Sequence, residues 1–245
     1  MSKITLEIYR GNGKGGTFQS YEVEPVPGMV VLDAIHQIQK EQDGTVACRW
    51  NCKAAKCGSC SAEVNGKPVL MCKSRIDSLP TDKPIVVTPL KAFPVVKDLV
   101  CDVSWNFSRS AMIPILKLKD EGSTEPLRMQ QIDVDRIQEF RKCIECFLCQ
   151  DVCHVLRDRE RTDIFFGPRQ MVRLASLEMH PLDVMDRRAF IKDNAGVGVC
   201  NITKCCTEVC PEHIHITDNA IIPLKERVAD TYFDPIRKLL RWGRK

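Results

Sequence analysis

Two runs of cysteines in the second half of the chain have the spacing of iron-sulfur cluster loops. The run CIECFLCQDVC follows the pattern C-x2-C-x2-C-x3-C, in which thiolates bind the iron atoms of a cubic cluster. The run CNITKCCTEVCP has the same spacing, except that Thr203 stands where the second cysteine is due. Because a hydroxyl is a poor ligand for a soft metal beside thiolates, this second run predicts a site with one iron fewer.

The two runs are expected to exchange ligands. In paired loops of this kind the first three cysteines bind one cluster, and the fourth binds the cluster of the other loop. The expected ligands are Cys143, Cys146, Cys149 and Cys210 for a 4Fe-4S cluster, and Cys153, Cys200 and Cys206 for a 3Fe-4S cluster. A second complete cube, with Cys205 as a competing thiol, stays open as the alternative.

A third group of cysteines lies in the first half of the chain. Its spacing, C-x4-C-x2-C-x11-C, is typical of a plant-type 2Fe-2S cluster, and its members are Cys52, Cys57, Cys60 and Cys72. Small residues between them let backbone N–H groups approach the sulfurs, and Lys53 and Lys56 add positive charge that favours reduction. The alternative is a structural zinc site, although zinc loops favour separated C-x2-C pairs.

Composition limits the remaining classes of function. The chain of 245 residues has fourteen cysteines, and Cys48, Cys101 and Cys205 are left over as small apolar side chains. The N-terminal MSKITLEIYR lacks the basic segment followed by an apolar segment that is typical of a secretory signal. We therefore expect reduced thiols that bind metal. The mild net charge of +4 argues against nucleic acid as a partner, and no apolar run is long enough to cross a bilayer. Without a substrate-pocket motif, three clusters predict an electron relay between partners.

The first hundred residues have the patterns of strands and turns. We expect a hairpin around GNGKGG, a helix over VVLDAIHQIQKEQ, a second hairpin at Asn65-Gly66 and a strand over 84–90. Together these elements predict a small mixed sheet with one helix across it. The glycines at 11, 13 and 16 match G-x-G-x-x-G, but no helix follows them, which argues against dinucleotide binding.

The rest of the chain has helical patterns. We expect helices over MQQIDVDRIQEFRK with Asp133 as its cap, over GPRQMVRLASLEMHP between two prolines, from about Asp183, and at the end of the chain. The join between domains is expected within residues 95–126. The final segment 233–245 is basic and amphipathic. It either lies against a membrane or a membrane-embedded partner, or forms a last helix with a solvated basic face.

With these motifs, nearly the whole chain resembles the iron-sulfur (B) subunit of succinate dehydrogenase and fumarate reductase, in respiratory complex II. The resemblance implies an α+β fold. A β-grasp plant-type ferredoxin-like domain over residues 1–105 would hold the 2Fe-2S cluster. An all-α bacterial ferredoxin-like domain over residues 106–245 would hold the 4Fe-4S and 3Fe-4S clusters. All eleven predicted ligands match the family's positions.

The resemblance also implies partners and a location. Electrons would pass from a flavoprotein subunit with covalent FAD, through the three clusters, to quinone at one or more membrane anchor subunits. This chain would carry no substrate chemistry itself. It would lie peripherally on the cytoplasmic or matrix face of the energy-conserving membrane. A fumarate reductase or heterodisulfide-reductase-type subunit is the first alternative, and a zinc-stabilised scaffold is the second.

Residues beside the expected 3Fe-4S ligands depart from the family. Many ubiquinone-reducing relatives have proline and a tryptophan pair after the first ligand and histidine after the second, whereas this chain has His154 and Asn201. The departure favours menaquinone or another type of anchor, with these two residues as candidates for the vicinity of the quinone. His154 titrates near neutral pH and so is a candidate proton donor, although a structural role is the favoured interpretation. A structural role is likewise the favoured interpretation of His213 and His215. A smaller departure is Ala55, where many relatives have glycine.

Overall fold

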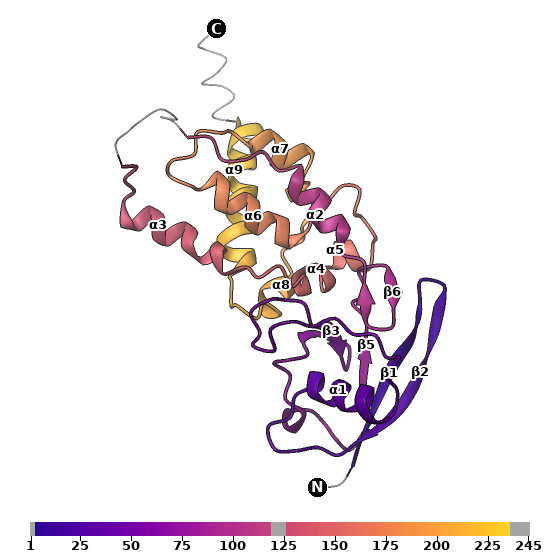
Figure 1. The fold of residues 1–245 in the computed structure, drawn as a ribbon. Helices are drawn as coiled ribbons and strands as arrows, with labels where there is room; N and C mark the ends of the chain where they lie inside the picture. The colour runs from indigo at the N-terminus through magenta and orange to yellow at the C-terminus, as the bar shows by residue number, and fades with distance from the viewer. Residues whose placement is uncertain (1–2, 119–125, 236–245) are drawn as a thin grey trace. The chain divides into compact units, whose positions relative to one another are not determined.

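The computed structural model describes residues 3–118 and 126–235, and the chain divides into two compact units (Figure 1). The first unit contains Met1–Val103, Ile144–Val152 and Val209–Pro211. The second contains Ser104–Cys143, Cys153–Glu208 and Glu212–Lys245. Both cysteine runs of the second half therefore contribute residues to both units. The expected domain boundary after residue 105 stays a prediction.

A five-stranded mixed sheet forms the body of the first unit. Its order is β2-β1-β5-β3-β4, with β1 and β5 parallel and the other neighbours antiparallel. The strands are β1 (Ile4–Asn12), β2 (Gly15–Val23), β3 (Ser61–Val64), β4 (Lys67–Leu70) and β5 (Ile85–Thr88), and a separate pair is formed by β6 (Val95–Lys97) and β7 (Val100–Cys101). A short 3-10 helix, η1, covers Ile76–Ser78.

The glycine-rich segment near the N-terminus is a hairpin, as the sequence predicts. β1 pairs with β2 from Ile4 opposite Val23 to Asn12 opposite Gly15. Gly11 and Gly16 face each other across the ladder, and a Cβ on Gly16 would lie 2.3 Å from a backbone oxygen. The glycines therefore serve close backbone approach in a hairpin, and a strand rather than a helix follows them.

Helix α1 (Val31–Glu41) packs on this sheet. It buries Leu32, Ile35 and Ile38, which share one face, and these side chains join the apolar core of the sheet. The hairpin between β3 and β4 turns at Asn65-Gly66, where both residues have left-handed φ values of 50° and 76°. Positive φ at both central residues is typical of type I′ turns, so the helix and this hairpin are confirmed.

The second unit is helical. Its α-helices are α2 (Ser104–Ala111), α3 (Gln131–Gln138), α5 (His154–Arg157), α6 (Pro168–Glu178), α7 (Arg188–Asp193), α8 (Cys205–Glu208) and α9 (Ile222–Tyr232), and the short α4 (Leu148–Asp151) belongs to the first unit. Three further turns are η2 (Glu139–Lys142), η3 (Val197–Val199) and the π-helix η4 (Ile216–Ile221). Mixed sheet and helices together confirm the α+β class. No helix among residues 3–118 and 126–235 is long and apolar enough to span a bilayer.

Two of the predicted helix starts are wrong. Gln130, not Asp133, is the N-cap of α3. Asp133 lies in the first turn, where its carboxylate interacts favourably with the positive end of the helix dipole. The helix expected from Asp183 begins only at Arg188, as α7. Asp183 instead forms an isolated bridge with Leu118, so its backbone is extended. The helix predicted over GPRQMVRLASLEMHP is confirmed as α6. The predicted final basic segment lies outside the described residues from 236 onward.

Arg187 explains why this stretch is not helical. Its guanidinium is fully buried and lies 2.8 Å from the Asp183 carboxylate. It also donates to the backbone oxygens of Pro114 at 2.9 Å and Ile115 at 2.6 Å. These bonds join two segments about seventy residues apart in sequence, and they hold residues 183–187 as a loop.

We predict that Arg187→Leu lowers the free energy of unfolding of the second unit by about 3–5 kcal/mol, because it leaves the Asp183 carboxylate buried without its cation. Urea unfolding followed by circular dichroism measures the change. The control is Arg161→Leu, which removes an exposed pair with Asp163 and should change stability by no more than about 1 kcal/mol. Equal effects of the two substitutions would show that the buried pair is not what stabilises this loop.

Candidate metal centres

The structure brings the four cysteines of the first group together in the first unit. The thiols of Cys52 and Cys57 are hydrogen-bonded to each other, as are those of Cys60 and Cys72. The charge of Cys57 also acts on Cys60, which connects the two pairs. Although 52–60 and Cys72 are separated by the β3–β4 hairpin, all four predicted 2Fe-2S ligands therefore belong to one thiol cluster.

The backbone around these thiols is turned towards sulfur. Lys53, Ala55 and Gly58 all have left-handed φ values, of 55°, 54° and 68°. The N–H groups of Ala54 and Lys56 lie 3.3 Å and 3.4 Å from the Cys52 sulfur. Left-handed residues within a loop build concave rows of N–H groups that bind anions, including iron-sulfur clusters. The loop is therefore prepared for a group with negatively charged sulfur.

The pKa values of the thiols differ with their surroundings. Burial raises the pKa of Cys57, but hydrogen bonds from Ser59 and Cys52 outweigh it and lower the pKa to about 6. For Cys60, burial raises the pKa to about 12, and the nearby thiols of Cys72 and Cys57 add to the increase. Gathered thiolates repel one another, so this site favours a bound cation that compensates their charge.

The predicted 2Fe-2S loop touches the predicted 4Fe-4S loop within the first unit. A Cβ on Gly58 would lie 2.8 Å from the Cα of Cys146 and 2.9 Å from the backbone oxygen of Ile144. The Ser61 hydroxyl donates to the backbone oxygens of Gly58 at 3.0 Å and Cys146 at 2.9 Å. Lys73, next to Cys72, donates to the backbone oxygen of Pro211 at 3.4 Å. The two loops are thus in direct backbone contact.

The predicted 4Fe-4S ligands differ in burial. Cys146 and Cys149 are buried, and Cys143 and Cys210 are partly buried. Three of them, Cys146, Cys149 and Cys210, belong to the first unit, whereas Cys143 ends a segment of the second. Near them the Asp151 carboxylate, which is fully buried, accepts the backbone N–H of Ala92 at 2.9 Å.

The predicted 3Fe-4S ligands gather in the second unit. Burial raises the pKa of Cys153 to about 11, and the charges of Cys205 and Cys200 raise it further. Burial likewise raises the pKa of Cys206 to about 11, with contributions from the same two thiols and from Cys153. Four thiols therefore lie within electrostatic reach of one another: Cys153, Cys200, Cys205 and Cys206. The Cys206 sulfur also lies 3.4 Å from the Thr217 hydroxyl.

The two cysteine runs share a backbone pattern. In the first, Glu145 and Phe147 have left-handed φ values of 56° and 61°, two and four residues after Cys143. In the second, Ile202 and Lys204 have φ values of 60° and 64°, at the same distances from Cys200. Left-handed φ is uncommon outside glycine, so the match indicates one common loop conformation. Thr203 occupies the position that Cys146 occupies in the first loop.

The remaining predicted residues lie at the surface or are satisfied. His154 is exposed, and its Nδ1 lies 3.0 Å from the Asp158 carboxylate. Asn201 is exposed. His215 is held by Glu139, which accepts its backbone N–H at 2.8 Å and lies 2.7 Å from its Nδ1, so a structural role fits it. Lys53 lies 3.8 Å from Asp33 and over the Trp50 ring.

The leftover cysteines have surroundings of different kinds. Cys48 and Cys101 are partly buried, and burial raises the pKa of both, to about 11 for Cys101. The Cys101 thiol donates to the backbone oxygen of Leu90, and Cys48 lies beside the Gln39 amide. These two fit the prediction of small packed side chains. Cys205 does not, because it lies among the predicted 3Fe-4S ligands.

The donor sets fit iron-sulfur clusters. All three are built from thiols in loops with left-handed residues, and Ala54 and Lys56 show N–H groups directed at sulfur. Within the described residues no three His, Cys, Asp or Glu side chains converge on a single metal ion. In a cluster each thiolate binds a different iron atom, so convergence on one point is not its signature.

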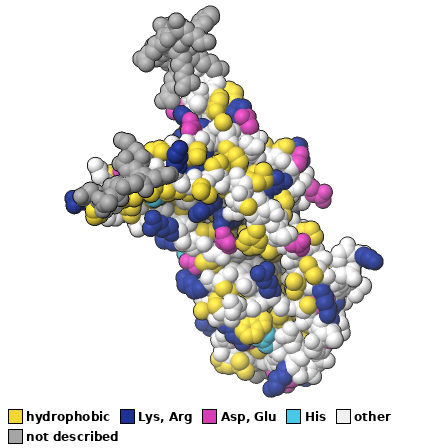
Figure 2. Space-filling model, turned by 45° about the horizontal axis from the view of Figure 1, so that its top comes forward, with side chains coloured by type: hydrophobic (Ala, Val, Ile, Leu, Met, Phe, Trp, Pro, Cys, Tyr) yellow, Lys and Arg dark blue, Asp and Glu magenta, His cyan; other side chains and the backbone are white. Residues whose placement is uncertain are grey.

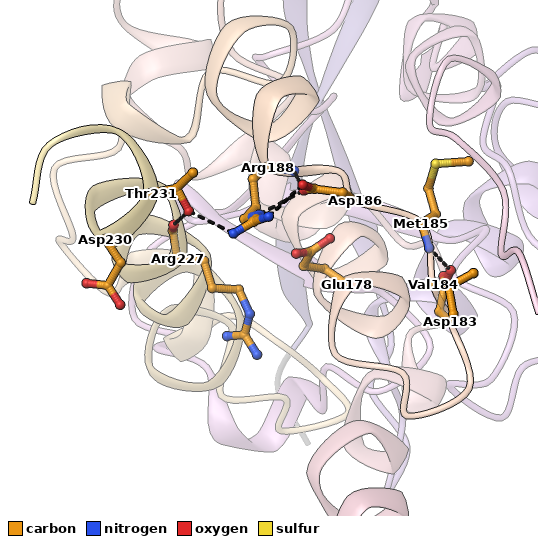
Figure 3. A pocket seen from close by; sticks show the side chains of 9 residues that line it. All are labelled: Glu178, Asp183, Val184, Met185, Asp186, Arg188, Arg227, Asp230 and Thr231. Atoms are coloured by element: carbon orange, nitrogen blue, oxygen red, sulfur yellow. Dashed lines mark hydrogen bonds and ion pairs between the residues drawn. The ribbon is translucent and has the colours of Figure 1, made fainter. Parts of the chain in front are cut away.

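A separate pocket of about 280 Å³ lies in the second unit (Figure 3). Charged side chains line much of it, and Arg188 bonds both the Asp186 carboxylate and the Thr231 hydroxyl there. None of the predicted site residues lines this pocket. On the face in Figure 2, lysine and arginine side chains lie interspersed with acidic and apolar ones.

Comparison with known proteins agrees with these sites. Residues 5–108 match the family of 2Fe-2S iron-sulfur cluster binding domains, and residues 139–214 match that of 4Fe-4S dicluster domains. The chain is therefore an iron-sulfur protein that joins these two kinds of domain.

Relatives along nearly the whole chain define the family. A chain of the Mycobacterium smegmatis Sdh1 complex in the apo form is 56% identical, with a TM-score of 0.93 over 96% of this chain and 98% of that one. The fumarate reductase iron-sulfur subunit of Mycobacterium tuberculosis is 31% identical over 87% of this chain and 88% of the relative. The succinate dehydrogenase iron-sulfur subunit of Bacillus subtilis is 30% identical over 81% of each.

The chain belongs to the family of iron-sulfur subunits of succinate dehydrogenase and fumarate reductase, and it is thus an electron-transfer subunit of an oxidoreductase complex. The resemblance predicted from the cysteine motifs is confirmed, and an iron-sulfur protein is favoured over a zinc scaffold. Three further relatives match at similar identity, but this chain spans only between 40% and 44% of their length.

Sequence reasoning missed the contacts that connect the loops. Gly58 is visible in the sequence as a glycine inside a ligand run, which signals a special backbone requirement. Its neighbour Cys146 lies 88 positions further on, and no local pattern connects the two. The same holds for Ser61, whose bond to the Cys146 oxygen has no sequence signal.

We predict that Gly58→Ala lowers the iron content and the visible circular dichroism of the 2Fe-2S site, because the new methyl would overlap the Cys146 backbone. The matched control is Gly28→Ala, since Gly28 also has positive φ, +81°, but a methyl added there would meet no atom within 4 Å. The control should lose only the left-handed strain of about 1–2 kcal/mol and should keep its clusters. If both variants retain equal iron, the close approach of the loops has no role in holding the cluster.

Proposed function

We propose that this chain relays single electrons from a flavoprotein subunit carrying FAD to quinone at a membrane anchor, as the iron-sulfur subunit of a succinate:quinone oxidoreductase. The observation that carries the proposal is the direct contact between the 2Fe-2S and 4Fe-4S loops at Gly58 and Cys146. Loops in backbone contact place their cofactors at short range. The order of transfer would be 2Fe-2S, 4Fe-4S, 3Fe-4S and quinone.

The proposed ligand assignment follows the thiol sets. The 2Fe-2S cluster would be held by Cys52, Cys57, Cys60 and Cys72, the 4Fe-4S cluster by Cys143, Cys146, Cys149 and Cys210, and the 3Fe-4S cluster by Cys153, Cys200 and Cys206. When bound, these clusters supply one-electron oxidation and reduction. The electrostatic connections within the first and third sets support the assignment.

The chain's own groups would adjust the charge at each site. The N–H groups of Ala54 and Lys56 donate to the Cys52 sulfur, which favours the more negative, reduced state. Cys153 and Cys206 are buried, so two of the three proposed ligands are shielded from water. The left-handed residues around Thr203 repeat those of the 4Fe-4S loop, which supports a cube-like site that lacks one ligand.

The finer fold assignment is also part of the proposal. The strand order β2-β1-β5-β3-β4, with β1 parallel to β5 and α1 packed on the sheet, supports a β-grasp plant-type ferredoxin-like domain. The helices and paired cysteine runs of the second half support a bacterial ferredoxin-like domain. We keep residues 1–105 and 106–245 as the proposed domains.

The exposure of two residues beside the proposed 3Fe-4S ligands supports a proposal for where quinone binds. His154 and Asn201 adjoin the 3Fe-4S ligands Cys153 and Cys200, and both are exposed, so a quinone or an anchor subunit can reach them. The Asp158 carboxylate lies 3.0 Å from the Nδ1 atom of His154 and would orient the imidazole. The unfamiliar residues at these positions favour menaquinone. The complex would lie on the cytoplasmic or matrix face of the membrane.

The second candidate is a fumarate reductase or heterodisulfide-reductase-type subunit that serves a soluble catalytic partner. Similarity to the fumarate reductase subunit of M. tuberculosis and to a fumarate reductase (CoM/CoB) subunit of Methanothermobacter marburgensis supports it. Isolation of the native complex distinguishes the two. Membrane subunits with covalent flavin support the first, and a soluble thiol-linked complex supports the second.

Low-temperature EPR of the isolated complex tests the proposal. We expect a three-iron signal in the oxidised state and two-iron and four-iron signals after reduction. A colourless preparation without paramagnetic signals would contradict the relay. Two four-iron signals with no oxidised-state signal would contradict the 3Fe-4S assignment alone.

We predict that Thr203→Cys converts the three-iron centre towards a cube, since it restores the thiolate at the position that Cys146 has in the other loop. The oxidised-state signal should weaken, the reduction potential should fall, and quinone reduction should slow. Thr207→Cys is the control, because Thr207 lies in the same run but its hydroxyl is bonded to Thr217. An unchanged oxidised-state signal in Thr203→Cys would place the open corner elsewhere.

A further inference from the structure

Cys205 lies beside the position where the second cysteine run lacks a ligand. The Thr203 hydroxyl and the Cys205 sulfur are 3.2 Å apart. Thr203 stands in the place of a cluster ligand, so a thiol outside the predicted ligand sets touches the side chain that replaced that ligand. Cys205 is partly exposed, which leaves it accessible to metal from solvent.

Cys205 also belongs to the thiol cluster of the third site. It directly precedes the proposed ligand Cys206, and both residues lie in α8 (Cys205–Glu208). The thiol therefore belongs to the same short helix as a proposed ligand and also lies near Thr203. Cys48 and Cys101, by contrast, lie in the first unit, where Cys48 lies beside the Gln39 amide and the Cys101 thiol donates to the backbone oxygen of Leu90.

The loop backbone is already suited to a cube. Ile202 and Lys204 have the left-handed conformations that Glu145 and Phe147 have in the 4Fe-4S loop. A fourth iron would thus need a thiolate at the open corner but no new backbone fold. The side chain in contact with Thr203 that can supply one is Cys205.

We propose that Cys205 is a reserve ligand for a fourth iron, so that the third site takes up ferrous iron when reduced and releases it when oxidised. The inference rests on the proposed 3Fe-4S site and deepens it. It makes electron delivery to quinone responsive to ferrous iron, because cluster type is one determinant of reduction potential.

The uptake step balances with two co-reactants, ferrous iron and a one-electron reductant. One electron enters the oxidised three-iron site, and Cys205 loses its thiol proton to solvent. Its sulfur and the cluster sulfides at the open corner would then replace water ligands of the incoming ferrous ion. When one electron passes on to the quinone of the proposed function, these bonds would break, the ferrous ion would leave with water ligands, and Cys205 would take up a proton.

The test uses the purified whole complex. Untreated, oxidised samples of the wild type and of Cys205→Ala should both show the three-iron EPR signal. After anaerobic treatment with dithionite and isotopically enriched ferrous iron, followed by desalting, Mössbauer spectroscopy measures retained label. We expect the wild type to retain one labelled iron per chain and Cys205→Ala to lose it. Cys48→Ala, which removes another leftover thiol, should behave as the wild type.

The double variant Thr203→Cys/Cys205→Ala shows whether a thiolate at this corner is sufficient. It should hold four irons without added iron. This result would show that Cys205→Ala does not itself damage the site. The inference fails if the wild type retains no label, or if Cys205→Ala retains as much as the wild type. Absence of the three-iron signal from the untreated wild type would instead contradict the proposed 3Fe-4S site and, with it, the reserve ligand.

Discussion

Repulsion between thiolates held in a small volume is the constraint on which this structure depends. Burial and neighbouring thiols raise the pKa of Cys60, and likewise that of Cys153 and Cys206. Such groups are stable together only as neutral thiols or as ligands that share bound cations. The clusters are therefore structural as well as functional groups. Cysteine loops that would repel one another when ionised would be held together by bound iron.

Backbone conformation is the second factor that stabilises the thiolates against their mutual repulsion. Each ligand run contains non-glycine residues in the left-handed region, among them Lys53, Glu145 and Ile202. Such conformations cost free energy of order 1–3 kcal/mol each and persist where surrounding structure or a bound group compensates for them. The compensation here is the approach of N–H groups to sulfur, seen directly at Cys52. The strained backbone directs N–H groups at the sulfur, and the favourable interaction of these groups with the negative charge compensates for the free-energy cost of the strain.

Local patterns predicted much of the fold. The two hairpins, α1 and α6 depend on turn residues, apolar periodicity and helix-starting prolines, all of which act within a few residues. The errors at Asp133 and Asp183 have another origin. Asp183 resembles a helix start in sequence, but the buried Arg187 binds it and also binds backbone at Pro114 and Ile115, and these contacts outweigh the helix preference.

The sequence by itself determined the iron-sulfur family of the chain, because cluster loops use a fixed spacing of cysteines. From that spacing it also predicts which cysteines form sets and marks Thr203 as the position of the missing ligand. Tertiary structure decided what no spacing contains. It placed Gly58 against Cys146 and Cys205 among the third set, and it buried Arg187 with Asp183. These outcomes depend on which side chains fold against one another, and contacts between residues far apart in sequence arise only when the core and the loops pack together.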